Sequence, residues 1–504
     1  MVGSTIVSAP GKVLITGGYL VLDPAYEGTV IATSSRFFTV VTPSSSVPRD
    51  TIRVRSPQFL EAEWNYSLAS GSDGLVGATP SPANKSNNKF VEIALRETLK
   101  VIQAIVSVDA LNDTLKDERS ERCGLKVEIV GDNDFYSQRR VLDSLSLPPN
   151  KESLDRLPRF NHLNTPIGDV HKTGLGSSAA LITSLVAALL LNFSVIPASS
   201  LGGNRSHDTA ANNSRQDLDF IHNTSQYIHC LAQGKVGSGF DISSAVYGSQ
   251  VYKRFDESVL RSLIDDSARP VPSELLATLR PNAAWTSQTT PIVLPPRIQL
   301  LLADVDAGSD TPSLVGKVLK WRTSSPDQAR EIWTRLHDDN RRVASLLGRL
   351  GDLARDDPGD YSASLEGFAT AHSNTPGGAQ CSQVLQDLKA AMTAVRRGMK
   401  TMGESASVPI EPDEQTELLD ACCAIPGVIG GGVPGAGGYD AIYVLVVDTP
   451  DSTPTDGPCT AEQVRLLWSN WKSLSVSPLQ SRAEEGGLRY YDSVAQVRGL
   501  ERSL

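Results

Sequence analysis

The sequence predicts an α+β protein with two domains. At 504 residues the chain is too long for a single hydrophobic core, and its 40% hydrophobic and 21% charged content is ordinary for a globular protein. Strand-like runs fall early, within residues 5–42, whereas residues 326–402 have the apolar spacing of two or more long helices. We therefore expect an N-terminal domain over 1–255, a linker over 256–297 and a C-terminal domain over 298–504.

The N-terminal domain should begin with strands. Thr5–Ala9 and Val13–Thr16 flank Lys12, and β-rich runs follow over Val30–Thr33 and Phe37–Thr42. A lysine between a Pro-Gly turn and an apolar strand is held in place rather than moving freely in solvent. On position alone, an edge-strand lysine is a commoner interpretation than a catalytic one.

Two stretches of this domain have the composition of insertions. Residues 43–88 are rich in Ser, Pro, Asn and Gly, with edge strands expected at Thr51–Ser56 and Trp64–Leu68. Residues 195–216 are poor in apolar side chains and predict a disordered surface insertion, followed by a helix over Asp217–Gln233.

A glycine-rich loop before a buried helix is the strongest single indication of function. The loop at 174–180 leads into an apolar run at 181–190, and such a turn presents backbone N–H groups at the positive end of a helix, where phosphates bind. The alternative is a capped core helix with a tight entry turn. A hydroxyl of Ser177 or Ser178 would cap the helix or hold Mg²⁺ beside the phosphates. The candidate phosphate contacts are Gly174, Leu175, Gly176, Ser177, Ser178 and Ala179.

Other phosphate loops do not fit. A Walker loop needs Gly-Lys followed by Ser or Thr, and all three Gly-Lys pairs in this chain are followed by valine. The loose dinucleotide pattern is present at 174–179, but no carboxylate lies near position 195, and Pro166 and Gly168 interrupt any strand leading in. A dinucleotide-binding fold is therefore not expected.

Two further segments are candidates. Asp241 follows the turn Ser238-Gly239-Phe240, where an acidic residue by itself favours a helix cap. Six of the residues within 430–440 are glycines, and the strand Ala441–Val447 follows them. Because clustered glycines cost backbone entropy, either a flexible hairpin or a close approach to a ligand accounts for them.

Composition limits the partners and the compartment. A net charge of −10 argues against a general nucleic-acid or anionic-membrane binder, so the cations that meet phosphates must be concentrated locally. Residues 178–196 contain Thr183, Ser184 and Asn192, which favours a buried helix over a membrane span. Six cysteines without a C-x-x-C pattern, and a start without a signal-peptide pattern, favour free thiols and a cytoplasmic protein.

Three separated segments resemble, in order, the three motifs of the GHMP kinase superfamily. They are Pro10-Gly11-Lys12 with the Gly17-Gly18-Tyr19 turn, the loop at 174–180, and Pro434–Gly438. Within that superfamily, Ala9–Asp23 and Ala232–Asp241 resemble the fungal type of phosphomevalonate kinase. The resemblance covers most of the chain and implies a ribosomal-S5-like N-terminal domain, a ferredoxin-like C-terminal domain, and ATP and acceptor in the cleft between them.

The resemblance also implies a reaction and its residues. It would transfer phosphate from ATP to 5-phosphomevalonate, giving 5-diphosphomevalonate, within the mevalonate pathway to isoprenoids and sterols. Lys12 and Asp241 would be catalytic, Ser178 would bind Mg²⁺, and Lys172 would add a phosphate contact. Mevalonate kinases place a Mg²⁺-binding Glu where this chain has Cys230, so the second protein ligand of the metal stays open.

Two phosphates in one cleft repel each other, so cations are expected beside the acceptor. We expect arginines there, with hydroxyl groups and the late glycine loop completing the site. The residues expected on the acceptor side are Tyr19, Ser35, Arg36, Ser238, Ser309, Thr311, Arg396, Arg397, Gly435, Ala436, Gly437 and Gly438.

Alternatives remain at this point. A mevalonate kinase would carry the missing acidic ligand, and a diphosphomevalonate decarboxylase matches less well around Gly17–Tyr19. A ligand-sensing regulator without activity should have lost Lys12, Asp241 or the glycine loop, and all three are present. Small-molecule substrates are the only partners expected, and the chain could act as a monomer or a homodimer.

Overall fold

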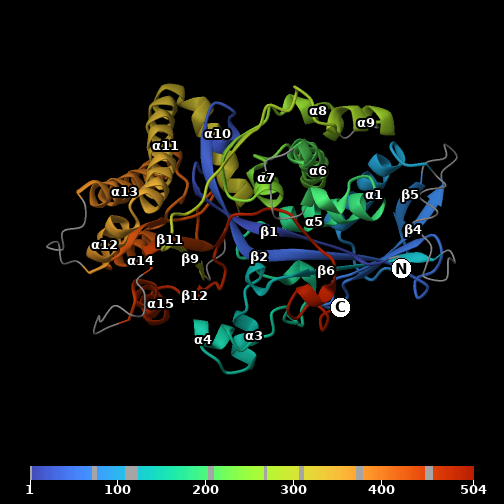
Figure 1. Cartoon of the computed structure of the whole chain (residues 1–504), viewed down its shortest axis with the longest axis horizontal. Coiled ribbons are helices and arrows are strands. Elements are labelled where there is room, and N and C mark those ends of the chain that lie inside the picture. The colour runs from blue at the N-terminus through green and yellow to red at the C-terminus, as the bar shows by residue number, and fades with distance from the viewer. Residues whose placement is uncertain are drawn as a thin grey trace.

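Two β-sheets, set toward opposite ends of the molecule, organise the fold (Figure 1). The computed structural model describes residues 3–70, 76–107, 123–201, 209–265, 270–305, 311–370, 379–448 and 458–504. Within these ranges, ten strands form the larger sheet and four the smaller one. The strands are β1 Thr5–Thr16, β2 Glu27–Ser44, β3 Thr51–Arg55, β4 Glu63–Ser70, β5 Val76–Pro80, β6 Gly124–Gly131, β7 Gln250–Lys253, β8 Gln288–Pro291, β9 Ile298–Val305, β10 Val428–Gly432, β11 Ala441–Val447, β12 Val476–Pro478, β13 Ala483–Glu484 and β14 Arg489–Tyr491.

Helices cover both sheets. Short 3-10 turns lie at Leu20–Leu22, Asn133–Phe135, Ile167–Asp169, Ala198–Leu201 and Val494–Gln496. The α-helices are α1 Lys89–Gln103, α3 Arg139–Ser144, α4 Lys151–Leu154, α5 Ser177–Asn192, α6 Thr209–Gln233, α7 Phe240–Tyr247, α8 Ser258–Ile264, α9 Pro272–Leu279, α10 Thr311–Ser324, α11 Pro326–Asp356, α12 Pro358–Ala369, α13 Ala379–Ala406, α14 Asp413–Cys423 and α15 Thr460–Asn470.

The long antiparallel pair β1 and β2 forms the middle of the larger sheet. The four short runs predicted between residues 5 and 42 are these two continuous strands. Their register shifts between Pro10 and Lys12, which marks a bulge. Since a proline has no N–H for the ladder and a bulge re-aims the neighbouring side chain, the Pro-Gly sequence explains why Lys12 leaves the regular alternation.

Helix α5 is the central helix of the N-terminal half. Apolar side chains surround it on all sides, and all twelve residues from Ala179 to Leu190 are buried. It packs on β1 and β2 together with α1, α6 and α7, which lie on the same face of the sheet (Figure 1). The opposite face, at Phe38 and Val130, is covered in part by Val497 and Leu500 from the C-terminal segment.

The predicted insertions and linker prove to be structured in large part. Residues 43–88 contain β3, β4 and β5, which extend the larger sheet beyond β6. Residues 209–216 form the start of α6, while 202–208 lie outside the described residues. The expected linker 256–297 holds α8, α9 and β8, and β8 pairs with β7. Pairing with a sheet edge supplied order that composition alone did not reveal.

The C-terminal half is built on the sheet β10-β11-β9-β12, with α10 to α15 around it (Figure 1). The glycines 430–432, expected in a loop, form most of strand β10, where a side chain on Gly430 would collide with Met392. After β12 the chain returns to the larger sheet through β13 and β14, so the second half is not self-contained.

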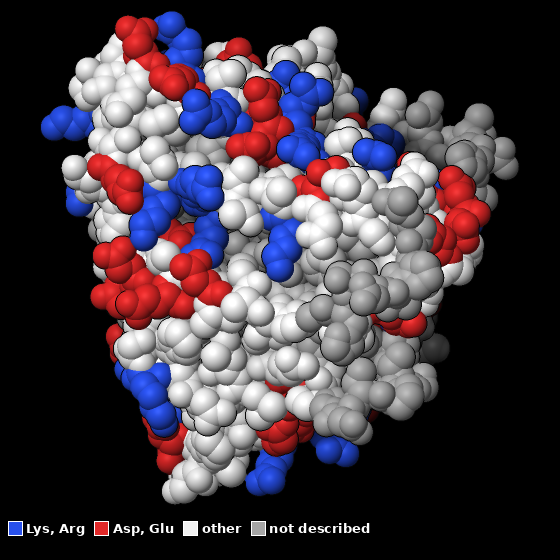
Figure 2. All heavy atoms as spheres, turned by 90° about the vertical axis from the view of Figure 1, so that its left-hand side faces the viewer, with Lys and Arg blue, Asp and Glu red and all other residues white. Residues whose placement is uncertain are grey.

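Charged side chains of both signs are interspersed on the face of this half shown in Figure 2. Many are ion-paired along one helix, as Arg335 is with Glu331 and Arg355 with Asp352 on α11. None of the six cysteines forms a disulfide. Among the described residues, we find no helix with the length and apolar content needed to cross a membrane.

Candidate active site

Lys12 joins the first motif to the glycine loop. Its backbone N–H donates to the carbonyl oxygen of Leu175 at 2.9 Å, and its Nζ donates to the carbonyl oxygen of Gly174 at 2.8 Å. Gly176 lies against the same side chain, since a Cβ there would stand 3.0 Å from Lys12 Cε. The bulge in β1 thus delivers the ammonium group to the lip of the loop. Burial lowers the pKa of Lys12, and the nearby carboxylate of Asp241 partly opposes that shift.

The glycine loop ends in a helix whose first turn is open to an anion. Gly176 occupies the N-cap of α5 in the left-handed region, at φ +78°, and makes no side-chain cap. The N–H groups of Ser177, Ser178 and Ala179 have no partner within the helix, because the first turn of any helix leaves such donors unpaired. This geometry suits phosphate oxygens, so the candidate anion site has the predicted form.

Asp241 and Ser178 are connected through a histidine. Asp241 lies in the first turn of α7, and its Oδ1 accepts from the N–H of Ile242 at 3.0 Å. His229 Nδ1 is 3.8 Å from Asp241 Oδ2, and His229 Nε2 is 3.1 Å from Ser178 Oγ. Burial lowers the pKa of His229, which favours the neutral ring. Three residues from three helices thus form one polar chain beside Lys12.

The third glycine loop packs directly on the first motif. The N–H of Gly435 donates to the carbonyl oxygen of Leu14 at 3.2 Å, and the hydroxyl of Tyr19 donates to the carbonyl oxygen of Ala436 at 2.7 Å. A Cβ on Gly18 would approach the carbonyl oxygen of Gly435 to 2.3 Å, so only glycine allows this approach. The three predicted motifs therefore meet in the folded chain.

Two residues expected on the acceptor side are buried elsewhere. Arg36 is 2% exposed, and its guanidinium donates to the hydroxyl and carbonyl of Ser8 and to the carbonyl of Gly487. Burial lowers the pKa of Arg36 to about 10. Ser35 is also buried, and its hydroxyl donates to Asp134 at 2.9 Å. Both side chains fasten the C-terminal segment to β2, Arg36 through Gly487 and Ser35 through Ser481, and their contact with the acceptor stays a prediction.

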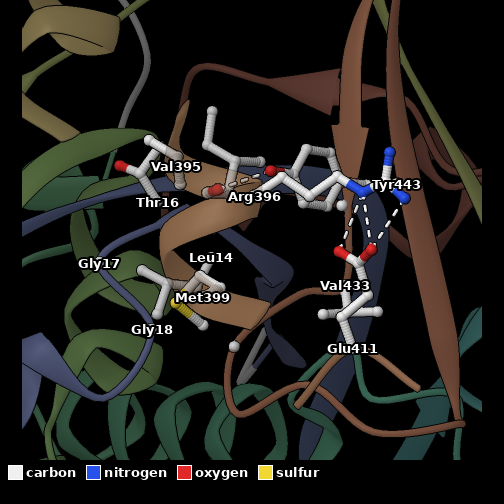
Figure 3. Close-up of a pocket in the computed structure, with 13 residues that line it drawn as sticks. Leu14, Thr16, Gly17, Gly18, Val395, Arg396, Met399, Glu411, Val433 and Tyr443 are labelled. Carbon is white, nitrogen blue, oxygen red and sulfur yellow. Dashed lines mark hydrogen bonds and ion pairs between the residues drawn. The ribbon is translucent and has the colours of Figure 1, made fainter. Parts of the chain in front are cut away.

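Arg396 lines a pocket but is already paired. Figure 3 shows this pocket between the first motif, at Leu14 to Gly18, and α13. The Nε of Arg396 lies 2.8 and 2.9 Å from the two carboxylate oxygens of Glu411, and its Nη1 lies 2.6 Å from Asp420. Those ion pairs leave little of Arg396 for a substrate phosphate. Arg397, the next residue, is exposed.

The remaining expected residues are less informative. Ser309 lies outside the described residues, and Thr311 is the first residue of α10. The carbonyl oxygen of Ser238 accepts from the hydroxyl of Tyr252 at 2.8 Å. Lys172 is exposed at the entrance to the loop and pairs with Tyr136 in an isolated β-bridge. The N–H of Gly438 donates to the carbonyl oxygen of Ile410, and this bond attaches the third glycine loop to the segment that contains Ile410.

Sequence reasoning missed two residues that shape the site. One is His229, which the sequence analysis did not single out. The other is Arg254, 6% exposed, whose guanidinium donates to the carbonyls of Val236, Gly237 and Leu22. Arg254 thereby fastens the loop before Asp241 to the end of the first motif. A lysine or arginine directly after a strand gives no sign of such long-range partners.

The donor set fits a cation held mainly by nucleotide phosphates. Mg²⁺ commonly takes one or two protein oxygens and completes its shell with phosphates and water. Among the described residues, no group of three His, Cys, Asp or Glu side chains stands together as a metal site. Ser178 Oγ and the Asp241 carboxylate, on either side of His229, are the oxygens at hand. Cys230, by contrast, is buried and its thiol accepts from Gln226.

Glycine-rich segments that meet around a lysine on this two-domain fold define a kinase of the GHMP class. Solved structures share the fold: the Lin0012 protein of Listeria innocua (TM-score 0.62, 15% identity, 97% of this chain and 100% of that one) and Streptococcus pneumoniae phosphomevalonate kinase in complex with phosphomevalonate and AMPPNP (TM-score 0.55, 13% identity, 95% and 99%). No protein-family model matches the chain.

Curated relatives give the family. The chain is 37% identical to the peroxisomal phosphomevalonate kinase of Arabidopsis thaliana, over 88% of this chain and 90% of that one. It is 35% identical to phosphomevalonate kinase of Aspergillus fumigatus, over 93% and 91%. The chain belongs to the phosphomevalonate kinases, a family of phosphotransferase enzymes.

Proposed function

We propose that this chain transfers the terminal phosphoryl group of ATP to the phosphate of 5-phosphomevalonate, giving ADP and 5-diphosphomevalonate. The observation that carries the proposal is the position of Lys12, bonded to the glycine loop at Gly174 and within the electrostatic reach of Asp241. A cation at the meeting point of a phosphate loop and a carboxylate is where the transferred group would pass.

The nucleotide side would bind through backbone groups. The N–H groups of Ser177, Ser178 and Ala179, in the first turn of α5, have no partner within the helix and are available to phosphate oxygens. Gly174 and Gly176 have no side chain that would keep a phosphate away from the loop backbone. Lys172 adds a positive charge at the entrance. Ser178 Oγ would hold Mg²⁺, which when bound neutralises charge on the ATP phosphates.

The acceptor phosphate needs little activation by a base. Its second pKa is about 6, so near neutral pH it is mostly a dianion and already nucleophilic. Lys12 then bridges the incoming oxygen and the transferred phosphoryl group, and Asp241 orients Lys12 rather than removing a proton. The positive field of Lys12 and the open first turn of α5 offset the repulsion between the two phosphates.

The acceptor side would be lined by the contact between the first motif and the third glycine loop. Tyr19, which is 3% exposed and bonded to Ala436, would line the side that faces the mevalonate carbon skeleton, and Gly435 and Gly437 would keep the loop close. Arg397 is the arginine of the expected set that has an exposed side chain to offer. Ser309 and Thr311 remain candidates for hydroxyl contacts.

One assay tests the assignment. Purified protein with ATP and Mg²⁺ is offered mevalonate, 5-phosphomevalonate and 5-diphosphomevalonate in turn, and ADP release is followed with a coupled enzyme. We expect rapid release with 5-phosphomevalonate alone. Release with mevalonate would indicate a mevalonate kinase, and CO₂ release with 5-diphosphomevalonate would indicate a decarboxylase. Omission of Mg²⁺ should abolish the signal.

The cellular setting is also a proposal. We place the enzyme in the mevalonate pathway to sterols and in the cytoplasm, on the basis of its composition and of its cysteines, none of which forms a disulfide. The Arabidopsis relative carries a peroxisomal name, so microscopy of the tagged, otherwise intact chain with a peroxisomal marker decides between the two compartments.

A further inference from the structure

His229 occupies a position that no motif of the sequence predicts. It is 3% exposed on the last turns of α6 and stands between Ser178 on α5 and Asp241 on α7. The residue one turn further on, Gln233, places its amide nitrogen 3.0 Å from the same His229 Nε2. Three side chains from three helices therefore converge on one imidazole ring.

The contacts define where the ring carries its hydrogen. An amide nitrogen can only donate, so Nε2 is an acceptor, and its single lone pair is shared between the amide of Gln233 and the hydroxyl of Ser178. A neutral imidazole has one N–H, which then lies on Nδ1, the nitrogen that faces Asp241 Oδ2 at 3.8 Å. The ring thus takes a proton donor on one side and presents a donor to a carboxylate on the other.

We propose that His229 is a positioning residue that orients both Ser178 and Asp241. A hydroxyl has one hydrogen and two lone pairs, so a Ser178 that donates to Nε2 turns its lone pairs away from the ring, free for a cation beside the phosphates. The N–H of Nδ1 faces the carboxylate of Asp241 at 3.8 Å, beyond hydrogen-bond distance, and acts on its orientation through electrostatic attraction. The inference rests on the site proposed above, in which Ser178 faces the metal and Asp241 faces Lys12.

The side chain of the neighbouring Cys230 does not orient Ser178 or Asp241 in this way. Its Sγ is buried and accepts from the amide of Gln226 at 3.1 Å. The chain therefore lacks the acidic residue at position 230 and has instead an imidazole, one residue earlier, that acts through Ser178. An acidic ligand and a histidine that orients a hydroxyl ligand are two ways to support one oxygen-bound cation.

Three variants of His229 and one control separate its effect on Ser178 from its effect on Asp241. His229→Phe keeps a buried aromatic ring and removes both nitrogens. His229→Gln places an amide near the Nε2 position, where its oxygen accepts from Ser178, and His229→Asn places one near Nδ1, where it donates to Asp241. The matched control is His222→Phe: His222 is 1% exposed on the same helix, and its ring packs on Tyr247 and Trp285, away from the site.

The first readout is ADP binding by calorimetry with and without Mg²⁺, which needs no turnover. We expect wild type and His222→Phe to bind ADP more tightly with Mg²⁺ than without. In His229→Phe, the increase in ADP affinity caused by Mg²⁺ should be about tenfold smaller than in the wild type, while the ADP affinity without Mg²⁺ is unchanged. In His229→Gln, the increase caused by Mg²⁺ should be retained. The second readout is kcat, which should fall about 10- to 100-fold in His229→Phe and be partly restored in His229→Asn.

The outcomes are distinct. An unchanged Mg²⁺ gain in His229→Phe, or an equal loss of ADP affinity with and without Mg²⁺, would overturn the proposal, since the latter indicates a packing role. If His229→Phe does not fold, the opposite responses of His229→Gln and His229→Asn support the proposal and identical responses refute it. Failure of the wild type to use 5-phosphomevalonate would reject the proposed reaction, yet the calorimetric comparison would still decide the role of His229.

Discussion

The nucleotide side and the acceptor side of the site differ in how far their charges are paired inside the protein. On the nucleotide side, Lys12 bonds a carbonyl oxygen and, within the described residues, has no carboxylate within 4 Å. On the acceptor side, Arg396 is held by Glu411 and Asp420 before any substrate arrives. A cation without an internal partner is available to a ligand, whereas a paired one is part of the framework.

This difference separates residues that act on a substrate from residues that hold the site in shape. Loss of a residue of the first kind lowers kcat at constant stability. Loss of one of the second kind lowers the free energy of unfolding, because its partner is left buried and unpaired. Each of the following changes tests on which side of that division a residue falls.

The largest effect is expected for Lys12→Met. Removal of the ammonium group should lower kcat at least about 10³-fold, comparable to loss of other cations that contact a transferred phosphoryl group. Asp241→Asn should cost less, because we assign Asp241 to orientation. Steady-state kinetics on both variants, with circular dichroism to confirm folding, measure the order. A greater loss in Asp241→Asn would show that the carboxylate acts as a base.

Next in size is Arg396→Gln, compared with Arg397→Gln. Glu411 has a side chain only 2% exposed, so the first change leaves it buried without its partner and should lower the free energy of unfolding by about 3 kcal/mol. Arg397 is exposed, and its change should leave stability within about 0.5 kcal/mol. Urea unfolding measures both. If Arg397 grips the acceptor, its variant should raise KM for 5-phosphomevalonate about tenfold and leave KM for ATP constant.

Arg36→Gln should act on stability in a similar way, with a smaller effect. The bonds from its guanidinium to Ser8 and Gly487 are lost, at a cost of about 2 kcal/mol. The melting temperature should fall while KM for 5-phosphomevalonate holds. A higher KM for 5-phosphomevalonate at an unchanged melting temperature would instead indicate that Arg36 contacts the acceptor.

The smallest effect is a pH dependence. Burial lowers the pKa of Lys12 from its ordinary value near 10.5, so kcat/KM should fall on the alkaline side at a pH below that value as the ammonium group loses its proton. Between the two pKa values the unfolded chain binds more protons, so this group's contribution to stability rises with pH there. Lys12→Arg should abolish the alkaline fall, because an arginine keeps its charge; a fall that persists belongs to another group.

The meeting of the glycine motifs could be predicted because glycines act through the backbone. Gly176 at the start of α5 and Gly18 against the third loop are needed for conformation and close approach, which sequence shows directly. The role of an arginine depends on partners far along the chain: Arg36 meets Gly487, and Arg254 meets Leu22. No local pattern encodes those pairings, so the internal partners of Arg36 were not predicted, and Arg254 and His229 were overlooked.

Long-range pairing also explains the strands that the sequence did not predict. The edge strands expected at Thr51–Ser56 and Trp64–Leu68 are β3 and β4, whereas β5 and β8 lie in stretches with the composition of loops and gain order by pairing with strands elsewhere. The helices and strands that carry their own periodicity, such as α5 and β9, fall within the expected ranges. The GHMP kinase fold itself is confirmed.

The chain passes between its two sheets twice, through residues 292–297 and again through residues 479–482. Leu479 is bonded to Leu302 of one sheet and Gln480 to Asp134 beside the other, so the second passage is short and fastened at both ends. A rotation of one half relative to the other must bend both connecting segments, 292–297 and 479–482. The rotation axis must therefore run close to both segments. Neither half can be excised as an autonomous piece without leaving an unpartnered edge strand on the other.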